Sequence, residues 1–281
     1  MINIGKYNVL EVKREVEFGY FLGDFDKNEV LLPKSHTKGM DIQEGDQMEV
    51  FVYKDSKGRP VSTLKKPLAT VGDVAYLKVT YQTEFGSFID FGLERDILVP
   101  LKEQRFKLQV GCKYLFYIYL DKTERLAATT SVDTYILNAK DEGVEFEVGQ
   151  EVIAQLYSRS ENGTLNVAID GKYRGIILPN EYFTNVYPGT EMKLRVKKIY
   201  EDGIIGLTPR QDRLTERDKL QEEILRYLEN HDGFMKFNDK SSPEDIKATF
   251  NTSKNYFKIA LGGLMKEGKI TQSKEGTTLI K

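Results

Sequence analysis

Cysteine and histidine are scarce in this sequence. Its 281 residues include one cysteine, Cys112, and two histidines, His36 and His231. A lone cysteine cannot form an internal disulfide, which suits a reducing compartment. Neither histidine has a cysteine or another histidine at metal-ligand spacing, so we expect no metal or cofactor site and interpret His36 as a solvated loop residue.

Long apolar runs are also missing. No segment is long enough to cross a bilayer, and Met1–Lys6 begins as a strand rather than as a signal sequence. With 40% hydrophobic and 30% charged residues, the composition is typical of a soluble globular protein. We therefore expect a cytoplasmic protein with no membrane partner.

Neither sign of charge is in clear excess. The 41 lysines and arginines nearly balance the 43 acidic residues, for a net charge of −2. This balance argues mildly against a nucleic-acid binder, although phosphate attraction depends on local clusters of cations. The sequence also has no carboxylate cluster, Ser-His-Asp set or phosphate loop, so we expect no enzyme activity.

What the chain does contain is a repeated order of strand and turn signals. Three features recur in the same order three times: a glycine within a strand, a short apolar segment that ends in proline (the proline step), and a second glycine before an apolar strand. The proline steps are Leu31–Pro33, Val99–Pro100 and Ile177–Pro179. Short strands separated by regular turn signals predict small closed β-barrels, so we expect three in tandem.

A different pattern follows the third repeat. From Leu214 the apolar period changes from 2 to 3.6, with Leu220, Ile224 and Leu228 in one helical stripe. Helix, short strand, two further helices and a β-hairpin make the winged-helix arrangement. The predicted fold is mainly β with a C-terminal α+β module, in domains at residues 1–67, 68–140, 146–212 and 213–281.

The order of a strand, a Phe-Gly-x-Phe strand, a Leu-Val-Pro step and a Gly-Asp turn resembles the S1-type RNA-binding domain, a five-stranded OB-fold barrel. Three such domains followed by a winged helix resemble the CvfB/YitL family of bacterial RNA-binding proteins over nearly the whole chain. One feature departs from the pattern. Many S1 domains have a histidine where this sequence has Pro33, Pro100 and Pro179, so a histidine contact to RNA is not expected.

Aromatic pairs are the candidate binding residues of the first two barrels. Phe18 and Phe21 would lie on opposite faces of a regular strand, but a bulge at Gly19 could bring both to one face, where bases can stack. The alternative is that one ring belongs to the core; the family resemblance favours RNA. Lys78 either reaches phosphate or is a solubilising charge. The candidate residues are Phe18, Phe21, Lys78, Tyr81, Phe85 and Phe88.

The third repeat replaces rings with cations. Its ring positions are interpreted as Asn162 and Leu165, so stacking is lost there. Strict alternation sends Lys193, Arg195 and Lys197 to the outer face of their strand, opposite Met192, Leu194 and Val196. These cations either follow an RNA backbone or form an ordinary charged surface.

In the winged helix, Lys254, Lys258 and Lys266 lie off the apolar stripe of the third helix. Acidic residues such as Glu267 interrupt this basic face, so RNA, DNA or protein contact remains open. The leading hypothesis is a non-catalytic protein that binds single-stranded RNA in post-transcriptional regulation. The alternatives are a DNA-binding transcriptional regulator and, less well supported, an enzyme such as a ribonuclease.

Overall fold

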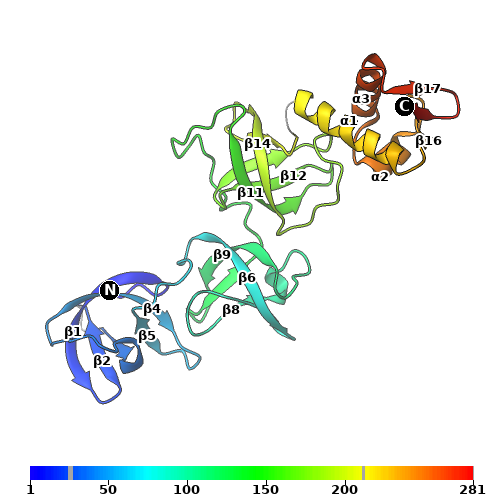
Figure 1. Cartoon of the computed structure of the whole chain (residues 1–281). Helices are drawn as coiled ribbons and strands as arrows, with labels where there is room; N and C mark the ends of the chain where they lie inside the picture. Colours follow the sequence, from blue (N-terminus) through cyan, green and yellow to red (C-terminus); the bar gives the residue numbers. More distant parts are fainter. Residues whose placement is uncertain (25–27, 211–212, 281) are drawn as a thin grey trace.

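The computed structural model describes residues 1–24, 28–210 and 213–280. Across these residues the chain forms three closed five-stranded barrels, followed by a small module with three α-helices and a three-stranded sheet. Figure 1 shows the four units in sequence order along an elongated molecule, with the two termini at opposite ends. This confirms the predicted tandem barrels and winged helix.

The three barrels share one topology, in which the third and fifth strands pair in parallel and the other neighbours are antiparallel. The first barrel contains β1 (Lys6–Val16), β2 (Gly19–Gly23), β3 (Glu29–Pro33), β4 (Gln47–Lys54) and β5 (Pro60–Thr63). The second contains β6 (Val74–Thr83), β7 (Gly86–Ile89), β8 (Ile97–Pro100), β9 (Lys113–Leu120) and β10 (Leu126–Thr129). The third contains β11 (Glu151–Arg159), β12 (Leu165–Ile169), β13 (Tyr173–Ile177), β14 (Glu191–Ile199) and β15 (Ile205–Thr208).

Glycines at the start of β2 and β7 allow neighbouring strands to approach closely. A Cβ atom on Gly19 would lie 2.2 Å from the carbonyl oxygen of Leu32, and one on Gly86 equally close to that of Val99. The expected bulge at Gly19 is not found there. The register shift lies instead on the partner strand β1, between Val12 and Arg14. Gly19 itself remains in register opposite Pro33 of β3.

The C-terminal module follows its local sequence signals. It contains α1 (Arg213–Glu229), β16 (Phe234–Met235), α2 (Pro243–Phe250), α3 (Lys254–Lys266), β17 (Ile270–Gln272) and β18 (Thr277–Leu279). The side chains of Ser242 and Ser253 accept the capping hydrogen bonds at the starts of α2 and α3. Ile224 from α1 packs with Phe257 and Leu264 from α3 in the buried core of the module.

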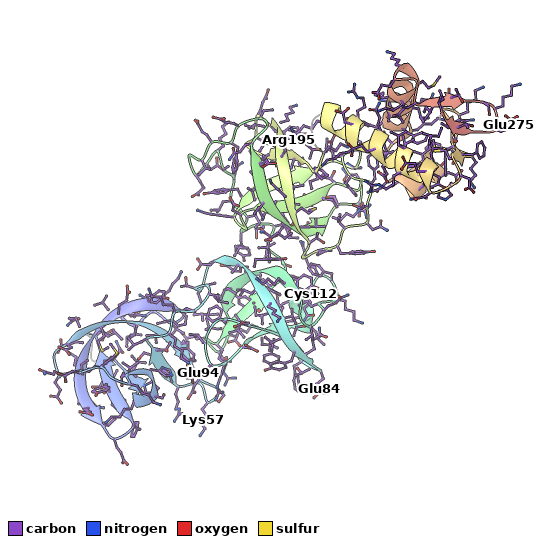
Figure 2. All side chains as sticks on the ribbon, in the orientation of Figure 1. Lys57, Glu84, Glu94, Cys112, Arg195 and Glu275 are labelled. Atoms are coloured by element: carbon purple, nitrogen blue, oxygen red, sulfur yellow. The ribbon has the colours of Figure 1, made fainter. Side chains whose placement is uncertain are left out.

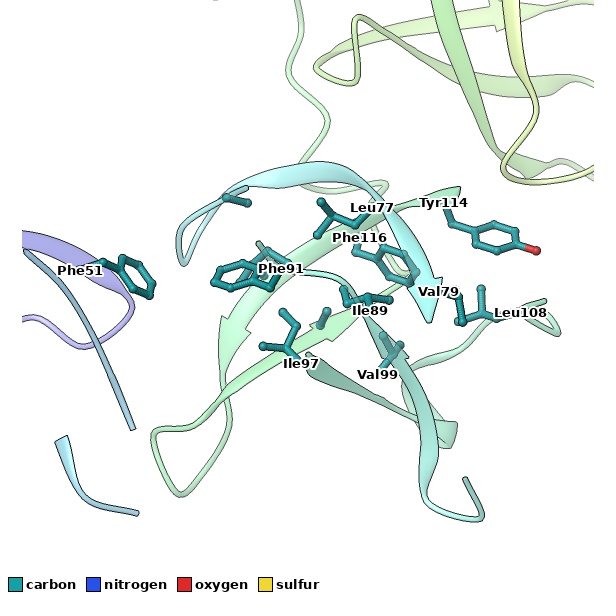
Figure 3. Packing of buried hydrophobic residues seen from close by; sticks show 13 residues of the cluster. Phe51, Leu77, Val79, Ile89, Phe91, Ile97, Val99, Leu108, Tyr114 and Phe116 are labelled. Carbon is teal, nitrogen blue, oxygen red and sulfur yellow. The ribbon is translucent and has the colours of Figure 1, made fainter. Parts of the chain in front are cut away.

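The first two barrels are packed together rather than linked loosely. Phe51 on β4 is fully buried and belongs to the same hydrophobic cluster as the core of the second barrel. Its ring faces Phe91, with the two centroids 6.1 Å apart (Figure 3). The interpretation of His36 as a solvated residue is wrong. Its side chain is only 4% exposed, and Nε2 lies 3.1 Å from Oε1 of Glu94 in the second barrel, which also accepts from Lys65.

Other contacts position the third barrel and the winged helix. The Tyr76 hydroxyl on β6 donates a 2.5 Å hydrogen bond to the carbonyl of Gly189. The Arg210 guanidinium lies between the rings of Phe183 and Tyr256, 4.7 and 5.0 Å from their centroids. This side chain joins the third barrel to α3 by cation–π contacts.

Candidate nucleic-acid interface

The second barrel presents three aromatic rings at one end of its outer surface. Tyr81 on β6 is paired in register with Phe88 on β7, and their rings stack with centroids 4.4 Å apart and planes 10° apart. Phe85, in the turn between these strands, is 69% exposed, and Tyr81 is 45% exposed. None of the three rings belongs to the buried core, so this set of rings is available to stack with unpaired bases.

The register shift in β6 explains why Tyr81 faces outward. Pairing shifts between Val79, which is fully buried opposite Ile89, and Tyr81, which is opposite Phe88. A bulge of this kind changes which side chain points outward. Lys78, on the same strand, is exposed and pairs in register with Lys113 of β9.

The first barrel has a related but different surface. Phe18 lies in the turn between β1 and β2 and is 60% exposed, whereas Phe21 on β2 is half-buried. The Arg14 guanidinium covers the Phe21 ring at 4.2 Å from its centroid and also pairs with Glu29. Arg14 stands where the second barrel has Tyr81. Sequence reasoning missed this residue, because only the bulge in β1 places it over the ring.

The third barrel has no ring at the positions equivalent to Tyr81 and Phe88. The interpretation of Leu165 as the equivalent of Phe88 was wrong by one residue. Leu165 is fully buried, and its strand neighbour Asn166 takes the register position of Phe88, opposite Ser158. The Asn166 side-chain amide donates to the hydroxyls of Ser158 and Ser160 at 3.0 and 3.1 Å. A hydrogen-bonded polar pair therefore replaces the aromatic stack.

The cationic strand β14 alternates as predicted, with Leu194 and Val196 buried in the barrel core. Each of the three outward cations also has a partner within the chain. Lys193 pairs with Glu151 at 2.8 Å, and Arg195 donates to the carbonyl of Arg210 at 2.9 Å.

Lys197 has a structural contact with a buried carboxylate. Its Nζ lies 2.5 Å from Oε1 of Glu181, whose other oxygen accepts a 2.7 Å hydrogen bond from Thr208. Burial alone would raise the pKa of Glu181, but the hydrogen bonds from Lys197 and Thr208 outweigh it and hold that pKa below its usual range. Lys197 therefore helps to hold the third barrel together.

The winged-helix lysines do not share one environment. Lys258 and Lys266 are exposed on α3, whereas Lys254 is partly buried and donates to the carbonyl of Lys240 at 3.3 Å. Ile259 and Met265 are also exposed on this helix, at 48% and 47%. The free surface of α3 is thus mixed basic and apolar.

The residues that the structure describes hold no group of three histidine, cysteine, aspartate or glutamate side chains arranged to bind a metal ion. In the same ranges, no helix is both long and apolar enough to cross a membrane. Figure 2 shows the distribution of all described side chains over the four units.

Comparisons with known domains match the chain in three places. The family described as S1 domain matches residues 4–65 and 71–131, over the first and second barrels. The family described as CvfB-like winged helix domain matches residues 222–279.

Relatives match over nearly the whole chain. The YitL protein of Bacillus subtilis is 31% identical over 95% of this chain and 91% of its own length. Conserved virulence factor B of Staphylococcus epidermidis is 29% identical, with 99% and 97% covered. Among solved structures, a Streptococcus pneumoniae protein described as multidomain with nucleic acid binding domains matches with a TM-score of 0.53 and 28% identity, over 99% of this chain and 98% of that one.

Proposed function

Because this chain belongs to the CvfB/YitL family, which joins S1 domains to a CvfB-like winged helix, we propose that it binds single-stranded RNA without catalysing a reaction. The observation that carries the proposal is the ring set of the second barrel, formed by Tyr81, Phe85 and Phe88. Stacking is worth about 1–3 kcal/mol per base. A duplex buries the faces of its bases, so such rings favour single strands.

The proposed role is post-transcriptional. A protein that holds unpaired segments and leaves them intact changes how other factors reach an RNA, and so affects its processing, stability or translation. The cytoplasm is the proposed location, since the single cysteine suits a reducing compartment.

Transcriptional regulation through duplex DNA is the second candidate. It is favoured by the exposed Lys258 and Lys266 on α3, the helix that enters the major groove in many winged-helix proteins. Glu267 follows Lys266 directly and opposes phosphate contact at this end of the helix.

The test is a salt titration of the full chain against single-stranded RNA, single-stranded DNA and duplex DNA of the same sequence. We expect tighter binding to single-stranded RNA than to duplex DNA at every salt concentration, and recovery of uncut RNA. Equal or tighter binding to the duplex would favour the winged-helix candidate instead. Shortened RNA in a preparation free of contaminating nuclease would contradict the non-catalytic proposal.

A further inference from the structure

A cleft of about 660 Å³ lies where the first and second barrels meet. One wall comes from the end of β4 and the following turn, including Tyr53 and Ser56. The other comes from the second barrel and includes Tyr81, Phe88 and Arg95. The ring pair of the second barrel thus continues into a space that the second barrel alone does not enclose.

The two walls are held in fixed relation by buried and charged contacts. Phe51 of the first barrel packs into the core of the second against Phe91. Lys54 pairs with Glu124 across the junction at 2.5 Å, and Glu94 accepts from two side chains of the first barrel. A cleft already formed in the free protein loses little conformational entropy when a ligand enters.

The wall from the first barrel offers an uncommitted hydrogen-bonding group. The hydroxyl of Tyr53 has no hydrogen-bond partner in the described ranges of the chain. Burial, together with the negative charge of Glu94, raises the pKa of Tyr53 above its usual value. The hydroxyl therefore stays protonated at neutral pH and can both donate and accept.

Both signs of charge line the cleft. Its carboxylates are Asp55, Glu94, Asp96 and Asp121. Asp96 accepts one hydrogen bond of 2.6 Å from Thr80, and the other three each accept at least two from donors of this chain. Among the cations, Arg95 makes no ion pair within the described residues. Arg125 donates to the backbone carbonyl of Ser56 at 3.2 Å.

We propose that this cleft is a composite site for one unstacked nucleotide of a single-stranded RNA, formed jointly by the first and second barrels. The base lies beside the Tyr81–Phe88 stack, the Tyr53 hydroxyl bonds its edge or ribose, and Arg95 contacts a neighbouring phosphate. The volume falls within the range of about 300–1,000 Å³ that is usual for small-ligand sites. This inference rests on the proposed binding of single-stranded RNA and adds a residue of the first barrel to a site on the second.

The first test removes only the Tyr53 hydroxyl. Tyr53→Phe keeps the ring that stacks on Phe51, so the fold should be unchanged. We expect affinity for a single-stranded RNA oligonucleotide to fall by roughly 3- to 10-fold, the range of one neutral hydrogen bond. Tyr7→Phe is the matched control, since Tyr7 is on the same barrel but outside the cleft, and it should bind as the wild type does.

The second test adds a cation, so that misfolding cannot imitate the expected gain. Ser56→Lys places an ammonium at the cleft and leaves the backbone carbonyl that Arg125 contacts. We expect tighter RNA binding and a salt slope steeper by about 0.7, the value for one added phosphate contact on a single strand. Gln43→Lys, which adds the same charge to the first barrel away from the cleft, should change the slope by less.

The outcomes separate this inference from the proposed function. If wild-type protein binds no single-stranded RNA, the proposed function fails and the inference fails with it. If the wild type binds but neither Tyr53→Phe nor Ser56→Lys differs from its control, the composite site alone is wrong. A nucleoside monophosphate should bind at least roughly 100-fold more weakly than the oligonucleotide, because it lacks linked contacts. If the nucleoside monophosphate and the oligonucleotide bound with equal affinity, the cleft would be a site for a free nucleotide, and the proposed RNA site would be wrong.

Discussion

The second and third barrels have the same topology and a bulge at the same place in their first strands, yet the position that the bulge exposes carries different chemistry. In the second barrel, Tyr81 and Phe88 form an aromatic stack. In the third, Ser158 and Asn166 form a hydrogen-bonded pair. The buried core of each barrel sets its topology, whereas outward residues contribute little to it and can differ between barrels.

A second difference lies at the turn that follows the third strand. Gln104 of the second barrel donates to the carbonyl of Val99. The corresponding turn of the third barrel contains Glu181, a carboxylate that is 4% exposed and held by Lys197 and Thr208. The third barrel therefore depends on a charge where the second uses a neutral amide, which gives the two barrels different sensitivity to pH.

The largest expected effect comes from removing the rings that distinguish the second barrel. Phe85→Ala with Phe88→Ala should weaken binding of single-stranded RNA by about 1–3 kcal/mol per ring and leave the salt slope unchanged, because stacking is not an ionic contact. Binding titrations at several salt concentrations measure both quantities. Asn166→Ala, at the equivalent position of the third barrel, is the control and should have a much smaller effect. Full affinity in the folded double variant would show that the rings are not the binding surface.

The next effect should fall on the stability of the third barrel. Glu181→Ala removes the hydrogen bonds with Lys197 and Thr208, and we expect a loss of about 1–3 kcal/mol in the free energy of unfolding. Urea denaturation measures the loss in free energy of unfolding, and amide hydrogen exchange on the native protein shows whether it falls in the third barrel. Gln104→Ala in the second barrel is the neutral comparison and should cost less.

The pH dependence of this loss has a definite sign. The folded pKa of Glu181 is lowered, so its contribution is complete above the unfolded value of about 4.3 and disappears as pH falls through the folded pKa. Wild-type protein should therefore lose stability on acidification more steeply than Glu181→Gln. Parallel stability curves for the two proteins between neutral and acidic pH would contradict this assignment.

A smaller effect should follow from transferring a ring to the third barrel. Asn166→Phe places an aromatic side chain at the register position of Phe88, and we expect RNA affinity to increase by about 1 kcal/mol, the lower end of base stacking. Isothermal titration of Asn166→Phe and of the wild type with the same single-stranded RNA measures this difference in affinity. An unchanged affinity would mean that RNA does not pass over this face.

The smallest effect is expected from the outward cations of β14. Lys193→Gln with Arg195→Gln should flatten the slope of log affinity against log salt by up to about 1.4 units, or 0.7 per phosphate contact, without altering base preference. Lys197 is retained because it holds Glu181. Lys38→Gln in the first barrel serves as a control for net charge. A slope equal to that of the wild type would show that these two cations make no phosphate contact.

Local signals predicted the winged helix well. Ser242 before Pro243 and Ser253 before α3 cap their helices, and Ile224 and Leu228 of the predicted helical stripe are buried. Each of these features depends on residues within one or two helical turns, so a short stretch of sequence contains the necessary information.

Features that depend on pairing between strands were predicted less well. The third repeat was misaligned by one residue because the spacing of the repeats does not say whether Leu165 or Asn166 takes the position of Phe88. The pairing of Asn166 with Ser158, past the register shift in β11, decides it and leaves Leu165 in the core. His36 was misplaced for a related reason, since the residue that covers it, Glu94, is in another barrel.

The sequence by itself determined that this chain is three small barrels and a winged helix, because glycine and proline positions and the change of apolar period are local properties. Only the tertiary structure decided which side chains meet. The bulges in β1 and β6 place Arg14 over Phe21 and Tyr81 against Phe88. The packing of Phe51 against the core of the second barrel holds the two barrels together, and residues of both line the cleft between them. Both depend on long-range packing, whose energy is shared among residues distant in the chain and cannot be assigned to any one segment.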